Sequence, residues 1–348
     1  MKLESSIFEK FKWFFNALIS FKKSSYPLTM IGSKLIIGAP LLSYIVTIKF
    51  PEDFLISSLE WSAGDTSIFS SAIGIATGLL LIYIELYSNA RHTARVLITG
   101  LPGTKSHFPE EVLSKTESRN AREPVQLGIE EDKGSLDSQI TRFNSEVCVD
   151  LFNRFIVHDK CKKLYIGGLA RIPFLVAYGS LLRNLTAEVV YFDKFHKTSK
   201  WKTLKEENKR ISLKSENLIN TPNVNGDIGI AVGFTTQINK LQIPEGLRNH
   251  TTLISASSKS DRNLIQNQEN LESISSEIQN IIDALSAIDN VKKIHLFLSI
   301  QSSLAIQIGR RFQEGTHRNW VVHNFNAEKG AYDWSIEIDR KEIRLYQV

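Results

Sequence analysis

The stretch Lys163–Asp193, KLYIGGLARIPFLVAYGSLLRNLTAEVVYFD, decides the fold of this chain. Its first apolar run stops at Gly167 and Gly168, a polar turn follows, and Phe174 begins an apolar run with helical spacing. A β-rich run then closes the stretch. A strand, a helix and a second strand within about 30 residues are typical of a βαβ unit with parallel strands.

The same pattern returns 130 residues later in Lys293–Asn324, KIHLFLSIQSSLAIQIGRRFQEGTHRNWVVHN, where Gly309 matches Gly179. Two interpretations are open. In the first, the likeness is only the one that any two βαβ units share. In the second, the chain holds a duplicated Rossmann-like domain with two related halves. Ligands of open α/β sheets bind beyond the carboxyl ends of the strands. Two such turns, brought together by pseudo-symmetry, would form one composite pocket.

The composition is that of a globular protein with a mild net charge of +5 over 348 residues. Such a charge does not favour binding to duplex nucleic acid, but it is compatible with an anionic ligand or an anionic membrane surface. The two cysteines, Cys148 and Cys161, have no CxxC partner. This pattern predicts neither a disulfide framework nor a zinc site.

Two apolar stretches near the N-terminus, Leu28–Phe50 and Ile68–Tyr87, predict transmembrane helices. Each has about 20 residues, which is enough to cross ~30 Å of hydrocarbon. Basic flanks and the acidic connection Pro51–Ser67 place both termini in the cytoplasm. A buried helical hairpin is the alternative. Residues 1–27 interleave aromatic and lysine side chains, which favours a helix in the membrane interface over one packed on protein.

Small residues at Ser70, Gly74 and Gly78 form a stripe on the second apolar stretch. Such a stripe lets two helices approach closely, either between copies of the chain or against the first apolar stretch. Residues 91–124 are rich in Pro, Gly, Ser and charge, which is typical of a linker.

The sequence contains no convincing catalytic set. HExxH, the P-loop GxxxxGK[ST] and the GxSxG elbow are all missing. Asp193 ends a predicted strand where dinucleotide enzymes hold the ribose, yet the turn before it lacks GxGxxG. We therefore assign no catalytic residue and no metal ligand, and expect a protein that is not an enzyme.

Three pieces carry a family resemblance: GGLARIPFLVAYG, IGIAVGFTTQI, and IHLFLSIQSSLAIQIGRRF followed by VVHNF. Over residues 125–348 the chain resembles a SAVED domain, the cyclic-oligonucleotide sensor of bacterial CBASS anti-phage systems. Gln301 is a departure, because the family's turn would have a proline there.

The resemblance, joined to the apolar stretches, implies an α/β chain of the two-transmembrane SAVED type. We expect an interfacial segment (1–27), a two-helix transmembrane region (28–90), a linker (91–124) and a duplicated Rossmann-like, CARF-like SAVED domain (125–348). The halves of that domain would cover about 125–225 and 226–348.

The implied function is that of a multi-pass effector in the bacterial inner membrane, with both termini and the sensor domain cytoplasmic. It would bind a cyclic di- or oligonucleotide made by a partner CD-NTase, with no cofactor besides this activating ligand. It would then self-associate and disrupt the lipid bilayer, causing abortive infection, and would not bind a nucleic-acid duplex. One alternative is a membrane-anchored nucleotide-processing or dinucleotide-dependent enzyme, and another is a membrane scaffold without a ligand.

We expect the ligand pocket to form where the turns of the two halves meet. Arg171 would contact phosphate, and Phe174 or Tyr332 would stack on a base. The predicted ligand-binding residues are Gly168, Ala170, Arg171, Phe174, Thr235, Ser299, Gln301, Ser302 and Tyr332.

Overall fold

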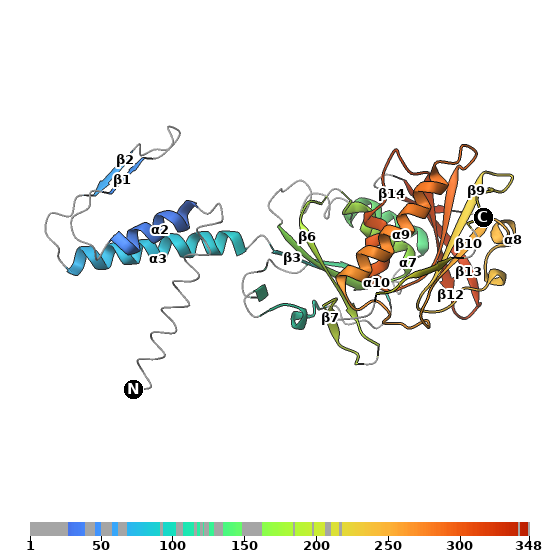
Figure 1. The fold of residues 1–348 in the computed structure, drawn as a ribbon, viewed down its shortest axis with the longest axis horizontal. Helices are drawn as coiled ribbons and strands as arrows, with labels where there is room; N and C mark the ends of the chain where they lie inside the picture. Colours follow the sequence, from blue (N-terminus) through green and yellow to red (C-terminus); the bar gives the residue numbers. More distant parts are fainter. Residues whose placement is uncertain are drawn as a thin grey trace. The chain divides into compact units, whose positions relative to one another are not determined.

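The chain divides into two compact units, Met1–Arg91 and His92–Val348 (Figure 1). Almost all of the predicted interfacial segment 1–27 lies outside the described residues, as does most of the acidic connection. The computed structural model describes residues 27–38, 46–49, 58–61, 68–90, 93–101, 107–114, 117–118, 121, 125–128, 135–147, 162–183, 185–196, 198–205, 210–215, 218–339 and 342–346.

The N-terminal unit is built on two helices, α2 (Pro27–Gly38) and α3 (Ile68–Ala90), with strands β1 (Val46–Lys49) and β2 (Ser58–Trp61) paired antiparallel between them in the chain. The helices approach at two glycines: a Cβ built on Gly32 would lie 2.5 Å from the carbonyl oxygen of Gly78. The buried Glu85 carboxylate accepts a hydrogen bond from the backbone N–H of Thr29. Gly78 therefore serves packing within the chain.

Within the part of the chain that the structure describes, no helix has the length and apolar character needed to span a bilayer. The first predicted span shows why: α2 has 12 residues, about 18 Å at 1.5 Å per residue, against ~30 Å of hydrocarbon. The chain does not continue this helix to Phe50, because residues 46–49 form β1. The predicted multi-pass location in the inner membrane is therefore wrong.

The first sheet of the C-terminal unit has the strand order β4-β3-β5-β6-β7. Its first four strands are parallel, and β7 runs antiparallel beside β6. The strands are β3 (Thr93–Thr99), β4 (Val125–Gly128), β5 (Lys163–Leu169), β6 (Glu188–Lys194) and β7 (Trp201–Thr203).

The second sheet has the order β14-β13-β12-β11-β9-β10-β8. Its segment β10-β9-β11-β12-β13 repeats the order and the directions of the first sheet, with four parallel strands and an antiparallel fifth. The predicted duplication is therefore a property of the whole sheet. The strands are β8 (Leu213–Ser215), β9 (Asp227–Gly233), β10 (Thr251–Ala256), β11 (Lys293–Ser299), β12 (Asn319–Asn326), β13 (Ala331–Asp339) and β14 (Glu342–Tyr346).

Strand β3 lies within residues 91–124, where we expected a linker. It reads TARVLIT, and all of its residues after Thr93 are buried. It pairs with both β4 and β5, as β9 pairs with both β10 and β11. The first half therefore begins at β3, because a parallel sheet needs this central strand to join β4 to β5.

Helices from each half pack on the sheet of the other half. Helix α7 (Ile172–Leu181) contacts β12 and β13, and α10 (Ser302–Arg310) contacts β5 and β6, while α7 and α10 also pack on each other. Figure 1 shows both helices between the sheets, with α9 (Gln268–Ser286) beside α10. One hydrophobic core joins both halves. The described part of the C-terminal unit also contains the helical segments η1 (Glu110–Val112), α5 (Leu136–Arg142), η3 (Phe143–Val147), η5 (Lys240–Gln242) and α8 (Glu245–Arg248).

Candidate functional site

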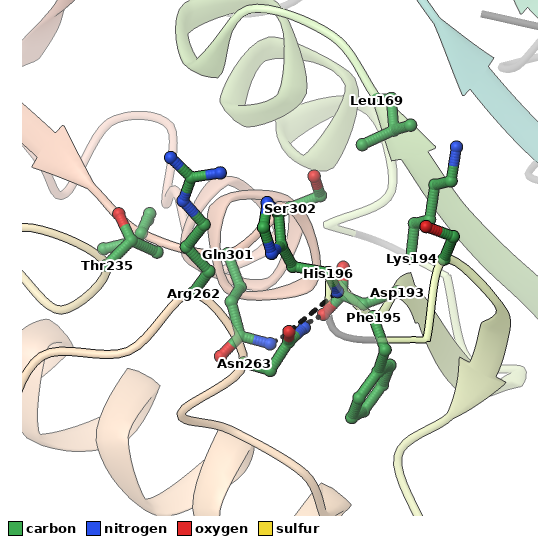
Figure 2. A pocket seen from close by; sticks show the side chains of 12 residues that line it. Leu169, Asp193, Lys194, Phe195, His196, Thr235, Arg262, Asn263, Gln301 and Ser302 are labelled. Carbon is green, nitrogen blue, oxygen red and sulfur yellow. Dashed lines mark hydrogen bonds between the residues drawn. The ribbon is translucent and has the colours of Figure 1, made fainter.

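A cavity of about 590 Å³ opens at the carboxyl end of β6, between the two halves (Figure 2). We name it the inter-half cavity. Each half contributes six of its residues, which come from strand ends and from the loops that follow them. The lining residues are Leu169, Asp193, Lys194, Phe195, His196 and Ser199 from the first half, and Thr235, Arg262, Asn263, Ile300, Gln301 and Ser302 from the second.

The fold explains why these residues meet. Asp193 lies near the end of β6, and Thr235 follows β9, so both are at carboxyl ends of parallel strands. Gln301 is the N-cap residue of α10, which packs across the sheet of the first half. The exchange of helices between the halves therefore brings a helix start of one half to a strand end of the other, at the edge where α/β sheets bind ligands.

Asp193 ties the two halves together at the floor of the cavity. Its Oδ1 accepts a hydrogen bond from the backbone N–H of Ser303 at 3.0 Å. Its Oδ2 accepts from the Ser303 hydroxyl and from Nε2 of Gln301. Burial raises the pKa of Asp193, and these hydrogen bonds partly offset that effect. The carboxylate thus anchors the first turn of α10, whose N–H groups have no helical partner.

Gln301 also fixes the loop that carries Arg262. Its Oε1 accepts from the backbone N–H of Ile265 at 2.6 Å, and its Nε2 donates to the Ile265 carbonyl at 3.0 Å. The φ angle of Gln301 is −69°, inside the range of about −65 ± 15° that proline imposes. The expected proline turn is therefore kept, and the side-chain amide adds a pair of loop contacts that proline lacks.

Two further polar contacts hold the walls of the cavity. Asn263 accepts a hydrogen bond from the backbone N–H of His196 at 2.8 Å, which joins the loop before α9 to the end of β6. The hydroxyls of Thr235 and Ser299 lie 2.8 Å apart, which links the ends of β9 and β11. The cavity therefore has a preformed polar frame, since its walls are bonded to each other before any ligand enters.

The open side of the cavity is positively charged. Lys194 and Arg262 are exposed, and neither forms an ion pair within the described part of the chain. Figure 2 shows their side chains on opposite sides of the cavity, both extending away from the floor at Asp193 and Gln301. One cation comes from each half. Guanidinium and ammonium groups placed this way favour an anionic ligand with more than one charge.

The structure brings together part of the predicted site. Thr235, Gln301 and Ser302 line the cavity, and Ser299 bonds to Thr235 beside it. The other predicted residues lie elsewhere. Gly168 faces β3 inside the sheet, where a Cβ would lie 2.5 Å from the carbonyl oxygen of Ile98.

The two predicted stacking residues are occupied by other contacts. Phe174 is only 1% exposed and packs against Trp334, with ring centroids 5.9 Å apart. Tyr332 packs edge-on against Phe297 at 4.9 Å. No base reaches Phe174 without displacing the core. Its neighbour Ala170 belongs to that core, and Arg171 is the N-cap residue of α7 rather than a residue that lines the cavity.

Sequence reasoning missed the loop residues of the site. Lys194 and His196 stand where a polar segment begins at the end of β6, and Arg262 and Asn263 stand in the loop between β10 and α9. A signal was present: each polar segment directly follows a β-rich run, as the turn after a ligand-binding strand does.

The fold and this site define a class: a two-halved Rossmann-like α/β domain with a polar cavity between its halves. Comparison with protein families matches residues 150–338 to SAVED, the "SMODS-associated and fused to various effectors sensor domain". That match covers more than half of the chain, so the protein belongs to the SAVED family. No curated protein matches it.

Solved structures with a similar fold include SAVED/CARF-domain containing receptors named Cap4. The Acinetobacter baumannii Cap4 structure with the cyclic trinucleotide 3'3'3'-cAAA is 15% identical with a TM-score of 0.48, covering 76% of this chain and 57% of that chain. The structure of the same receptor with 2'3'3'-cAAA is 15% identical in sequence with a TM-score of 0.47, and the match again covers 76% of this chain and 57% of that chain. Moraxella osloensis Cap4 is 16% identical in sequence with a TM-score of 0.43, and the match covers 76% of this chain and 56% of that chain. The chain thus spans a little over half the length of these receptors.

Proposed function

We propose that this protein is a receptor that binds a cyclic oligonucleotide in the inter-half cavity and releases it unchanged. The observation that carries the proposal is the composition of the cavity. Each half supplies one exposed cation, Lys194 or Arg262, above a shared polar floor. A cyclic oligonucleotide repeats its phosphates around a ring, so it presents negative charge to both walls at once.

Membership of the SAVED family supports a sensing role, because the family description is that of a sensor domain fused to effectors. Two of the Acinetobacter baumannii Cap4 structures carry cyclic trinucleotides. For this chain we propose the same broad class, a cyclic di- or oligonucleotide made by a partner CD-NTase in a CBASS anti-phage system. The polar frame of the cavity would recognise base edges and ribose hydroxyls through Asn263, Thr235 and Ser302.

We propose binding without turnover because the best-placed acid is already engaged. Both oxygens of Asp193 accept hydrogen bonds from Ser303, and Gln301 adds a third donor. A carboxylate held in this way is a poor ribose acceptor and a poor general base, since a new partner would have to break the cap of α10. The dinucleotide-dependent enzyme, our alternative, needs that carboxylate free.

We further propose that the N-terminal unit is the output part of the protein, and that ligand binding raises the assembly state and leads to abortive infection. A ligand acts on assembly only through different affinities for two states. Membrane disruption is not part of this proposal, because it depended on two spans that the described helices do not provide.

The test is calorimetric titration of the full-length protein with a panel of cyclic di- and trinucleotides. Arg262→Gln and Lys194→Gln should each weaken the best ligand at least tenfold, because a charge-assisted hydrogen bond is worth about 1.5–3 kcal/mol and 1.4 kcal/mol is a factor of ten. Arg344→Gln is the matched control, since this exposed arginine on β14 lies outside the cavity.

Two results would overturn the proposal. The first is unchanged affinity in both cavity variants. The second is conversion of the bound cyclic nucleotide, which chromatography of the ligand after overnight incubation would detect. Light scattering with and without the ligand tests the assembly step separately, and one size in both conditions would remove it.

A further inference from the structure

A second cavity, of about 640 Å³, lies at the opposite end of α10. Gln301 and Ser302 at the start of this helix line the inter-half cavity, whereas Arg310 at its end lines the second one. We name it the arginine cavity, because three arginines line it. Its lining residues are Arg183, Gln279, Arg310, Arg311, Phe312, Gln313, Glu314, Gly315 and Thr316.

The arginines are held in place mainly by neutral groups. Arg310 donates to the Leu185 carbonyl at 3.0 Å, and Nε of Arg311 donates to the Ser275 hydroxyl at 2.9 Å. Neither forms an ion pair within the described residues. Arg183 differs, since its Nη2 lies 2.5 Å from Oε2 of Glu314. Three guanidinium groups therefore share a cavity whose lining contains a single carboxylate.

Helix capping accounts for part of this arrangement. Positive side chains near the end of a helix interact favourably with its dipole, and Arg310 is the last residue of α10. Arg311 is the C-cap residue of α10 and shares this interaction, but the helix dipole does not explain why two adjacent guanidinium groups line one cavity together with Arg183. Burial lowers the pKa of Arg311, and repulsion from Arg310 adds to that effect, against attraction from Glu272. The Glu272 carboxylate itself accepts from Gln268 at 3.0 Å.

A guanidinium carries five N–H donors in a flat fork. Besides the bonds above, Nη2 of Arg311 lies 3.5 Å from the Glu272 carbonyl oxygen, and Arg310 also interacts with the Tyr191 hydroxyl. These contacts use only part of each fork, so other N–H groups remain for a ligand at the cavity. Forks of this kind match the oxygens of phosphate, and neighbouring forks match a chain of phosphates. An incoming anion would also offset the repulsion between the two adjacent cations.

We propose that the arginine cavity binds a phosphate-bearing anion, a diphosphate or triphosphate group, as a second ligand site of this protein. The site is independent of the inter-half cavity and of the cyclic oligonucleotide proposed for it. Its polar lining recognises the phosphates rather than a base, because the aromatic ring beside it, Phe312, is only 3% exposed.

The test uses the full-length protein and inorganic triphosphate, measured by calorimetry at low salt. Arg310→Gln and Arg311→Gln should each weaken triphosphate binding roughly tenfold, since each removes a charge-assisted contact. Because Arg311→Gln also removes the bond to Ser275, a variant that removes no packing contact is needed. Glu314→Gln is such a variant, because it removes the negative charge that lines the cavity and breaks the ion pair with Arg183. It should tighten triphosphate binding several-fold.

Two controls separate this site from the first cavity. Arg344→Gln removes one positive charge outside both cavities and should leave triphosphate affinity unchanged, while Arg262→Gln reports any triphosphate that enters the inter-half cavity. If Arg262→Gln abolishes binding and Glu314→Gln has no effect, the anion occupies the inter-half cavity and the proposal is wrong. Equal weakening by every charge variant would mean non-specific attraction, which also overturns it.

The source of the phosphate chain is settled by parallel titrations with adenosine triphosphate and adenosine. Inorganic triphosphate and the nucleotide should compete for one site, and adenosine should not bind there. Binding of adenosine that Arg311→Gln leaves unchanged would assign the recognition to the base and contradict a phosphate site.

Discussion

Gly179 on α7 and Gly309 on α10 lie against each other where the two helices cross. A Cβ built on Gly309 would lie 3.0 Å from the Cα of Gly179, and one built on Gly179 would lie 2.9 Å from the carbonyl carbon of Ile306. The two glycines are equivalent positions of the duplicated halves, 130 residues apart. The pseudo-twofold relation of the halves therefore passes through a contact that only glycine allows on both sides.

Gly309→Ala should lower the free energy of unfolding by about 1–3 kcal/mol, the usual cost of overpacking a tight core. The added methyl group would meet backbone atoms of α7, which cannot rotate away. Urea denaturation of the full-length protein measures the loss. Gly246→Ala is the control, because a Cβ on this helical glycine meets nothing within 4 Å. Equal midpoints for Gly309→Ala and the parent would contradict the close crossing.

The hydrogen bonds between Asp193 and Ser303 should contribute a coupling free energy between the two halves. Asp193→Asn should cost about 1–3 kcal/mol of stability, because it weakens the acceptor of a buried backbone N–H. In a double-mutant cycle with Ser303→Ala the two costs should be non-additive by about 0.5–3 kcal/mol. Ser302→Ala replaces the neighbouring serine, which donates no hydrogen bond to Asp193 within the described residues, so its cycle should be nearly additive. Additivity in both cycles would show that the two side chains act separately.

Glu117 should make the protein sensitive to acid. Burial alone would raise the pKa of this carboxyl group, but hydrogen bonds from Tyr165, Ser114 and Lys163 outweigh it and lower the pKa to about 2. The folded state thus binds fewer protons than the unfolded state. The stabilisation is complete above the usual pKa of 4.5 and is lost as the pH falls towards 2.

Glu117→Gln should therefore be less stable than the parent by about 1–3 kcal/mol at pH 7, with the difference shrinking below pH ~4. Denaturation midpoints at pH 7, 4 and 3 measure this trend. Glu342→Gln, at an exposed position on β14, should follow the parent at every pH. A difference for Glu117→Gln that stays constant down to pH 3 would remove the carboxylate's charge from the explanation.

The glycine contact in the N-terminal unit gives a local prediction. Gly78→Ala should separate α2 from α3, because a Cβ there would lie 2.6 Å from the Gly32 carbonyl oxygen. We expect amide hydrogen exchange in both helices to accelerate at least tenfold, the effect of about 1.4 kcal/mol on local opening. Thr77→Ala, at the neighbouring exposed position, should leave the exchange rates as they are. Unchanged exchange in Gly78→Ala would mean that the helices tolerate a wider spacing.

The sequence alone predicted the two βαβ units and the family resemblance, and the family match confirmed the latter. These features depend on local periodicity and on the order of short motifs, which a chain displays before it folds. The sequence left open whether the two units are equivalent, which the strand order decided. The same reasoning was wrong about the multi-pass location in the membrane. Hydropathy counted Leu28–Phe50 as one segment, but the helix within it ends at Gly38. The length of this apolar run therefore did not give the length of the helix within it.

Only the tertiary structure decided which turn residues face the inter-half cavity. Periodicity shows which residues of a helix share a face, but it does not show what covers that face. Phe174 and Leu304 are equivalent in sequence, and both proved to be buried because each helix packs across the sheet of the other half. The site formed instead where α10 meets the end of β6. Arg262 and Asp193 reach it from distant parts of the chain, because packing between the halves, not local sequence, sets which loops become neighbours.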